Sequence, residues 1–401
     1  MRWVVGDLNK YIRFAIKYKI KAMKKFNKNI LFTNQPKVLN LNVSTLTISR
    51  ILLTKPKVPL LVLGLFRCRN YSTTVSLGTH VSKEASEVLK IQSNSVIEFD
   101  FRSDIHINLT PWWVTGIIDS EGNFSIVTQK TSKGYKISLT LKVTQKEHSK
   151  GILLALQKYF GCGNIYLDNK KENAYKFSVN KVDDILYKII PHLDKYPLVT
   201  SKNLDYADFR RVALLMKDKL HLNSEVQNEI LLIKNNMNSL RTFEERWNYF
   251  QSIGPIRLTN EWVQAFIDGE GCFQFGILNT VNRGKPYTAL AHTLEVAQSN
   301  HDVWVLDALI QFFGCGYIKP KYNIKNINEA KNSRIVNRFV INQHAVVTEF
   351  FDKYPLFTRK RLDYLDWKKL INLKAERAQD TPEGIQKMKD IKVSMNKGRK
   401  E

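Results

Sequence analysis

The sequence carries the same short stretch of residues twice. "WVTGIIDSEGNFSI" begins at Trp113 and "WVQAFIDGEGCFQF" begins at Trp262, each with an aspartate two residues before a glutamate. Three more landmarks recur in the same order: "LKVTQ" and "LEVAQ", "YFGCGNIY" and "FFGCGYIK", and "DKYPLVTSKNLDYADF" and "DKYPLFTRKRLDYLDW". The separation of paired landmarks grows only from 149 residues (Asp119 to Asp268) to 158 (Lys202 to Lys360). This indicates a tandem duplication; two copies are too few for a solenoid, so we expect a pseudo-twofold pair of domains.

The duplication predicts where the chain divides. We expect a first repeat over residues 105–245 and a second over residues 246–401, preceded by a basic extension over residues 1–104. Residues 1–90 hold 17 Lys/Arg and only 3 Asp/Glu. Such a leader is typical of an organelle transit peptide, and equally of a translated extension upstream of an intron-borne reading frame or a flexible nucleic-acid arm. We assign the extension no fold and expect it to be poorly ordered.

Local patterns within each copy predict an α+β unit. Thr110 followed by Pro111 is a typical helix start, and Thr259 occupies the equivalent place in the second copy. Each helix then runs through the acidic motif and ends at a glycine, Gly122 or Gly271. The following segments alternate apolar and polar residues, which predicts antiparallel strands with one buried face and helices packed on that face.

The other face of each sheet is polar and partly basic. A net charge of +25 favours a polyanionic partner, and a two-stranded ribbon fits the major groove of DNA. An ordinary solvated sheet face is the alternative for any single residue. The DNA-contact candidates are Ser125, Val127, Gln129, Lys136, Ser138, Thr140, Lys142 and Thr144, with Gln274, Thr293 and Glu295 in the second copy.

The acidic motif predicts how two helices meet. Gly116 and Ser120 are four residues apart, as are Ala265 and Gly269, so each helix has a strip of small residues that permits close packing of the two helices. Residues two apart point to different sides of a helix. We therefore expect Asp119 and Asp268 to be buried acids that accept hydrogen bonds at the helix interface.

The glutamates would then lie side by side. Glu121 and Glu270 end the paired helices, and two adjacent carboxylates repel unless a cation lies between them. Mg²⁺ prefers oxygen ligands and also binds phosphate oxygens. Two carboxylates, divalent cations and a basic surface together indicate phosphodiester hydrolysis. Six histidines show no shared pattern by which they would compete for this role: His106, His148, His192, His292, His301 and His344.

"VTGIIDSEG" and "VQAFIDGEG" resemble the two signature helices of LAGLIDADG homing endonucleases. The paired "GCG" elements, the "YPL.T.K" segments and the closing "KVSMNKGR" resemble the single-chain, two-repeat branch of fungal mitochondrial introns. The resemblance covers about residue 108 to the end. Serine and glycine stand at positions 120 and 269, where that family usually has alanine, and both keep the helix strip small.

The resemblance implies two αββαββα repeats whose sheets form a saddle on double-stranded DNA. It implies a monomeric, mitochondrial enzyme that cuts both strands of a long asymmetric site across the minor groove. Glu121 and Glu270 would bind the metal ions with help from the carbonyl oxygens of Ser120 and Gly269. The same resemblance implies supporting catalytic roles for Lys202, Lys360, Gln145 and Gln298.

Two other functions remain open at this point. A maturase that folds its host group I intron RNA would use the same basic surfaces without needing both acids. A transcription-factor-like DNA binder on the same scaffold would have lost them. Both acids are present, which favours the nuclease. The longest apolar run near the N-terminus, Val58 to Phe66, is too short to span a membrane.

Overall fold

The structure is a computed structural model that describes residue 101 and residues 107–132, 134–320 and 335–399. These residues all belong to one compact unit, residues 91–401. Apart from Phe101, the expected N-terminal extension lies outside the described residues. No helix in the described part of the chain is both long and apolar enough to cross a bilayer.

The expected order of elements is confirmed in both repeats, with extra helical turns after the second hairpin. In the first repeat the elements are α4 (Pro111–Glu121), β1 (Gly122–Thr131), β2 (Gly134–Lys146), η2 (Glu147–Ser149), α5 (Gly151–Phe160), β3 (Asn164–Asn169), β4 (Ala174–Val179), α6 (Val182–Asp184), η3 (Ile185–Ile189), α7 (Ile190–Lys195), α8 (Lys202–Lys217), η4 (Leu220–Leu222), α9 (Ser224–Asn235) and η5 (Asn238–Leu240).

The second repeat follows the same plan after a linking helix, α10 (Phe243–Ile253). Its elements are α11 (Asn260–Glu270), β5 (Gly271–Asn282), β6 (Lys285–Ser299), η6 (Asn300–Asp302), α12 (Val303–Phe313), β7 (Tyr317–Pro320), β8 (Val336–Ile341), α13 (His344–Lys353), α14 (Lys360–Ala375), η8 (Ala378–Asp380), α15 (Pro382–Val393) and η9 (Asn396–Gly398).

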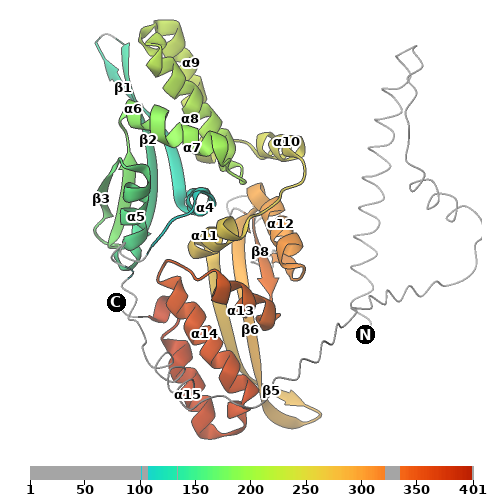
Figure 1. Cartoon of the computed structure of the whole chain (residues 1–401). Coiled ribbons are helices and arrows are strands. Elements are labelled where there is room, and N and C mark those ends of the chain that lie inside the picture. The colour runs from blue at the N-terminus through green and yellow to red at the C-terminus, as the bar shows by residue number, and fades with distance from the viewer. Residues whose placement is uncertain (1–100, 102–106, 133, 321–334, 400–401) are drawn as a thin grey trace, which may run out of the picture. The chain divides into compact units, whose positions relative to one another are not determined.

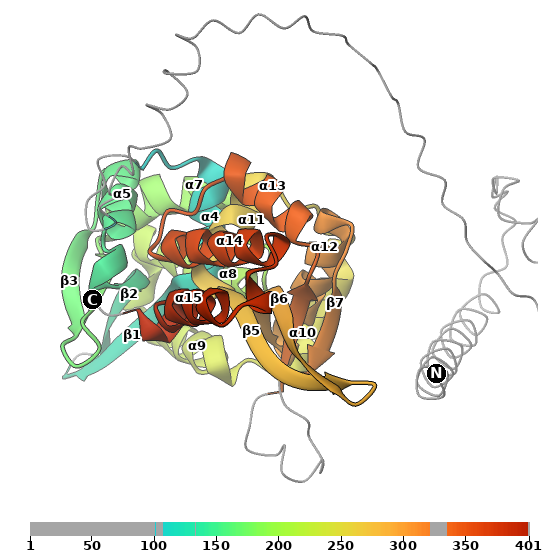
Figure 2. The same ribbon diagram turned by 90° about the horizontal axis from the view of Figure 1, so that it is seen from below.

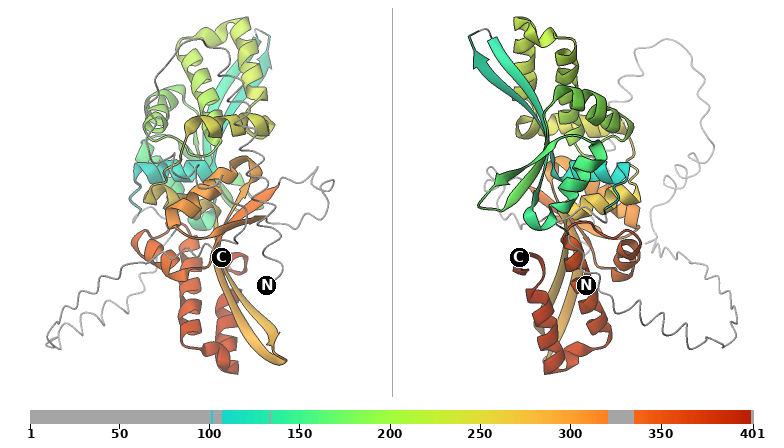
Figure 3. Two further views of the ribbon diagram at one scale, coloured as in Figure 1. Left: turned by 90° about the vertical axis from the view of Figure 1, so that its right-hand side faces the viewer. Right: turned by 60° about the vertical axis from the view of Figure 1, so that its left-hand side comes forward.

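Each repeat forms one four-stranded antiparallel sheet. The strand orders are β1-β2-β4-β3 and β5-β6-β8-β7. Figure 1 shows α4 and α11 side by side at the centre, with the long β1–β2 and β5–β6 hairpins extending away from them in opposite directions. Helices α8 and α9 lie along the first hairpin (Figure 3), and α14 and α15 lie next to each other along the second (Figure 2).

The strand alternation predicted from the sequence is confirmed. In β2, Ile137, Leu139 and the two apolar residues that follow at the same spacing are buried, whereas the intervening residues are exposed or half-buried. The buried faces and the covering helices form two hydrophobic cores, one in each repeat. Ala265 of the second repeat belongs to the core of the first. The two repeats therefore share packing where their motif helices touch.

The motif helices begin and end where the sequence indicates, but the terminal glycines act differently from the expected helix-ending signal. Thr110 and Thr259 cap the two helices by accepting from the Trp113 and Trp262 amides at 3.4 and 3.2 Å. Gly122 has φ −76°, which is not the left-handed geometry of a helix-ending glycine. A Cβ there would lie 2.5 Å from the Ile118 carbonyl oxygen. Glycine is needed for this close approach as the chain turns into β1.

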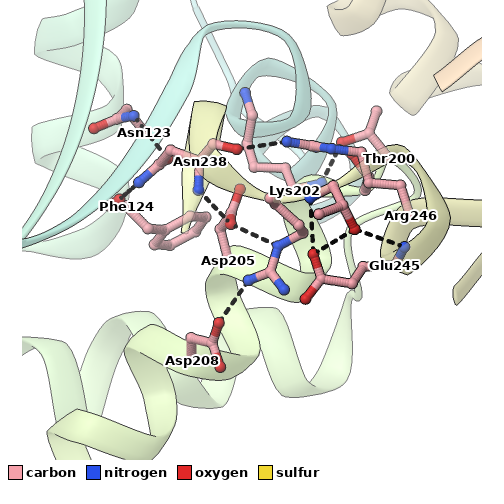
Figure 4. A network of polar contacts seen from close by, with 12 residues as sticks. Asn123, Phe124, Thr200, Lys202, Asp205, Asp208, Asn238, Glu245 and Arg246 are labelled. Atoms are coloured by element: carbon pink, nitrogen blue, oxygen red, sulfur yellow. Dashed lines mark hydrogen bonds and ion pairs between the residues drawn. The ribbon is translucent and has the colours of Figure 1, made fainter. Parts of the chain in front are cut away.

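Each repeat closes with a Met-Asn-x-x-Arg segment, a fifth repeated landmark that the sequence analysis missed. In the first repeat, the Asn238 amide donates to Asp205 at 2.8 Å, and its side chain donates to the Phe124 carbonyl at 3.0 Å (Figure 4). Arg241 pairs with Asp205 and with Asp208. Asn396 and Arg399 make the same contacts in the second repeat. These segments tie the end of each repeat to its first strand and to α8 or α14.

Candidate active site

Helices α4 and α11 approach each other along their small residues, as expected. A Cβ on Gly116 would lie 2.6 Å from the Trp262 carbonyl oxygen and 2.9 Å from the Ala265 Cβ. A Cβ on Gly269 would lie 2.5 Å from the Ser120 Cβ and 3.4 Å from the Glu121 Cγ. Larger residues would separate the helices. The packing therefore brings the C-terminal ends of α4 and α11 together.

The two glutamates are half-buried at these helix ends. Burial raises the pKa of Glu121, and the nearby charges of Lys360 and Lys202 oppose that rise. Burial, and then the charge of Glu121, raise the pKa of Glu270 to about 7. The second cause means that the two carboxylates interact with each other. Such a pair of oxygen ligands attracts a hard cation.

Gln145 and Gln298 flank the carboxylates. The Gln145 side chain hydrogen-bonds to Glu121, and the Gln298 side chain hydrogen-bonds to Glu270. The strands that follow the motif helices carry both glutamines, at equivalent positions in β2 and β6. They favour the ionised form of each acid and hold it in place.

One lysine lies at the C-terminal end of each motif helix, next to its glutamate. The Lys202 Nζ donates to the carbonyls of Ile118 at 3.0 Å and Ser120 at 3.3 Å. The Lys360 Nζ donates to the carbonyls of Ile267 at 3.0 Å and Gly269 at 2.8 Å. Burial lowers the pKa of both ammonium groups, and the surrounding carboxylates oppose this. Each ammonium therefore interacts with the negative end of a motif helix, next to its glutamate.

The first acid of each motif is a structural residue, as expected. Asp119 is 3% exposed and accepts from the Val199 amide at 2.8 Å, from the Thr200 amide at 3.1 Å and from the Thr200 hydroxyl at 2.6 Å. The Trp262 indole N–H of the second repeat donates to the same carboxylate at 2.8 Å. The Thr200 hydroxyl oxygen in turn accepts from the Lys202 amide at 3.2 Å.

Asp268 repeats this arrangement in the second copy. It accepts from Phe357 and Thr358 at 2.7 to 3.0 Å, and the Thr358 hydroxyl accepts from the Lys360 amide at 3.3 Å. Each aspartate thus fixes the loop that leads into the helix beginning with a lysine, while the glutamate two residues later lies at the site. This explains why each motif needs both acids.

The described residues contain no group of three or more His, Cys, Asp or Glu side chains that could hold a metal ion. The oxygen donors that fit a hard divalent cation are the Glu121 and Glu270 carboxylates and the carbonyls of Ser120 and Gly269. Both carbonyls already accept from lysine, and each keeps a second lone pair. Any such ion would therefore need further oxygen ligands from its substrate or from water.

The polar sheet face places the predicted contact residues in register. Ser125 pairs with Thr140, Val127 with Ser138, and Gln129 with Lys136. Lys142 and Thr144 continue the same face along β2. The DNA-contact roles of these residues stay predictions.

The matching face of the second repeat is less basic near its centre. Gln274 and Thr293 are directly opposite each other. Glu295 pairs with Arg338 at 2.7 Å and with Lys319 at 3.8 Å, so its charge is balanced within the sheet. Arg338 and its counterpart Lys176 belong to β8 and β4, and the sequence analysis missed both.

Two of the six histidines share a pattern that the sequence analysis missed. His148 and His301 are 153 residues apart, the same separation as Gln145 and Gln298. They occupy equivalent short turns, η2 and η6. His148 lines a hollow of about 530 Å³ together with Glu121 and Lys360, whereas His301 packs on Phe243 of α10 with ring centroids 6.3 Å apart. Comparing the offsets of all histidines would have found this pair.

The described arrangement agrees with comparisons to known proteins. A family model described as "LAGLIDADG endonuclease" matches residues 114–213 and 265–371. "Probable intron-encoded endonuclease 3" of Neurospora crassa is 29% identical over 307 residues, which cover 72% of this chain and 56% of that protein. The chain therefore spans only part of the length of the curated relatives that it matches, between about half and two thirds for the first three.

Two solved structures share the fold. The I-SmaMI LAGLIDADG homing endonuclease bound to cleaved DNA is 25% identical with a TM-score of 0.61, and the match covers 73% of this chain and 99% of that one. The I-LtrWI LAGLIDADG homing endonuclease bound to target DNA is 26% identical with a TM-score of 0.62, and the match covers 72% and 98%.

Proposed function

Because the chain belongs to the LAGLIDADG endonuclease family, we propose that it is a site-specific endonuclease that cuts both strands of a long asymmetric DNA target. The observation that carries this proposal is the pairing of Glu121 and Glu270 at the touching ends of α4 and α11. The two solved relatives described above are bound to DNA, which supports DNA as the partner here.

We propose Mg²⁺ as the cofactor, held by the two glutamates with help from the carbonyls of Ser120 and Gly269. When bound, such an ion polarises a phosphoryl oxygen and lowers the pKa of water. Lys202 and Lys360 place fixed positive charge where negative charge develops in the transition state. Gln145 and Gln298 orient the carboxylates. Asp119 and Asp268 act as positioning residues because they fix the loops that lead into the helices beginning with the lysines.

The chain is proposed to act as a monomer, because its two repeats supply both halves of the site. The polar faces of its sheets would contact the duplex through the residues named above, from Ser125 to Thr144 and from Gln274 to Glu295. Relatives named as intron-encoded, in Neurospora crassa and other fungi, support intron homing in a fungal mitochondrion. A maturase activity on group I intron RNA is the alternative.

The test is cleavage of a supercoiled plasmid that carries the intron-free sequence of the host gene. We expect a discrete double-strand break with Mg²⁺ that is lost with EDTA and in Glu121→Gln or Glu270→Gln. Glu225→Gln is the matched control, because Glu225 lies exposed on α9. Unchanged cutting in both active-site variants would refute the assigned acids. Splicing of the host intron RNA without any DNA cleavage would favour the maturase.

A further inference from the structure

The hollow beside Glu121 is lined by five basic side chains and by three acidic ones, Glu121, Asp268 and Asp363. Its basic lining side chains are Lys146, Arg359, Lys360, Lys397 and Arg399, to which His148 adds a titratable ring. Arg399 is balanced by Asp363 and Asp366, and Lys360 donates to helix carbonyls.

Two of the remaining cations, both lysines, are available to a ligand. Lys146 lies 3.7 Å from Glu172, but both side chains are largely exposed, so solvent screens the pair. Lys397 is exposed. The Arg359 guanidinium donates to the Arg399 carbonyl at 3.1 Å. The basic side of the hollow therefore fits an anion.

The Ser149 hydroxyl joins the two repeats at this hollow. It is hydrogen-bonded to the His148 Nδ1 at 2.9 Å and accepts from the Arg359 amide at 3.2 Å. The histidine turn of the first repeat is thus fixed to the start of α14 in the second. This contact places His148 and Arg359 at one wall of the hollow.

The equivalent positions around the other glutamate lack these cations. The offsets of the duplication pair three cationic residues with serines and one serine with an acid: Lys146 with Ser299, Arg359 with Ser201, Lys397 with Ser239, and Ser149 with Asp302. Three positive charges are missing there, and one negative charge is added.

Helix α10 also covers that second place. Arg246 donates to the Ser201 hydroxyl and to the Asn238 carbonyl, both at 2.5 Å (Figure 4). Asp302 accepts from the Ser201 amide at 2.6 Å, and Phe243 packs on His301. The side chains that would form a symmetric hollow are therefore engaged with one another and with the linker.

We propose that the hollow lined by His148, Lys146 and Lys397 is a phosphate-binding subsite for one DNA strand, and that the other half of the active site has no equivalent. The proposal rests on the proposed function, because the ligand is the backbone of a DNA substrate. A phosphate held here fixes its strand next to Glu121 and Lys360. That strand is positioned better and is cut first.

The number of phosphate contacts can be measured from the salt dependence of binding. Each phosphate neutralised by the protein adds about 0.9 to the slope of log affinity against log salt concentration. The test variant is Lys146→Ser with Lys397→Ser, which gives each position the residue of the other repeat. Both side chains are exposed, so the fold should be unaffected. The matched control, Lys387→Ser with Lys389→Ser, removes two exposed lysines from α15 outside the hollow.

Binding is measured on a mixed-sequence duplex of about 40 base pairs, in EDTA, between about 50 and 200 mM NaCl. We expect the slope of the test variant to fall by about one relative to the unsubstituted protein, because one phosphate contact is lost, and the slope of the control to stay the same. Equal slopes for the test variant and the unsubstituted protein, or an equal fall in the control, would overturn the subsite.

Strand order is measured on the plasmid target with each strand labelled separately. The unsubstituted protein and the control should nick one strand in excess before linear product forms, and the test variant should lose that excess. An unchanged excess in the test variant, or equal nicking of both strands by the unsubstituted protein, would overturn the proposal. If the unsubstituted protein cuts no DNA, the proposed nuclease function fails, whereas the salt slopes still decide the phosphate subsite.

Discussion

Replacing Glu270 with glutamine should remove most of one pH-dependent contribution to stability. Burial and the charge of Glu121 raise the pKa of Glu270 from 4.5 to about 7 in the folded protein. The folded state therefore holds this proton more strongly than the unfolded state does. The resulting stabilisation is complete below about pH 4.5 and is lost as the pH rises through about 7.

The size of this contribution follows from the two pKa values. One pKa unit corresponds to about 1.4 kcal/mol, so the shift of Glu270 is worth about 3 kcal/mol at most. Between about pH 5 and pH 8 the protein should lose about 2 to 3 kcal/mol more unfolding free energy than Glu270→Gln does. Other buried groups titrate in both proteins, and those that do not interact with Glu270 cancel in this comparison.

The assay is urea unfolding in EDTA, at the two pH values, for the unsubstituted protein, Glu270→Gln and the exposed-site control Glu225→Gln. Adding Mg²⁺ at the higher pH should restore stability to the unsubstituted protein and to the control, and much less to Glu270→Gln. The reasoning is refuted if all three proteins have the same pH dependence, because Glu270 would then ionise freely.

Three further outcomes follow from the packing, the ion pairs and the charge. In chemical denaturation, Gly116→Ala should lower the unfolding free energy by about 1 to 3 kcal/mol, because the added Cβ would collide with the backbone of α11. The control Gly276→Ala has no neighbour closer than 3.5 Å and should change the unfolding free energy by less than about 1 kcal/mol. Arg241→Ala should lower the unfolding free energy by about 3 to 5 kcal/mol, because it leaves the buried Asp205 carboxylate without its cation. Arg210→Ala removes an ion pair that is much more exposed to solvent and should lower the unfolding free energy by less than about 1 kcal/mol. DNA affinity should fall steeply with added NaCl in filter-binding measurements, and a flat response would contradict a broad basic contact surface.

The duplication allowed much of the fold to be predicted from the sequence. Equal spacing of landmarks requires two similar domains, and the alternation in residues 135–144 requires strands with one buried face. The small residues at Gly116 and Gly269 indicated how the motif helices pack. These features depend on short-range periodicity, which a sequence displays directly.

The surroundings of the site were harder to predict, because they depend on which segments meet in space. Nothing near Arg246 in the sequence indicates that it donates to Ser201, 45 residues earlier. His148 and His301 could be paired by their offset, but only packing reveals that α10 covers His301 and not His148. The sequence analysis placed the terminal glycines correctly but gave the wrong physical reason. Glycine is needed at position 122 because the chain passes close to Ile118, and not because the residue adopts a left-handed conformation.

The single linker between the repeats has a wider consequence. A homodimer built from one such repeat must present identical surfaces to both partners, so every substitution appears twice. In this chain the connecting helix covers the surroundings of one glutamate, near Ser201 and His301, and substitutions accumulate separately on each side. Joining two identical repeats in one polypeptide thus allows their sequences to diverge. A protein with two different repeats can then recognise DNA sequences that are not palindromes.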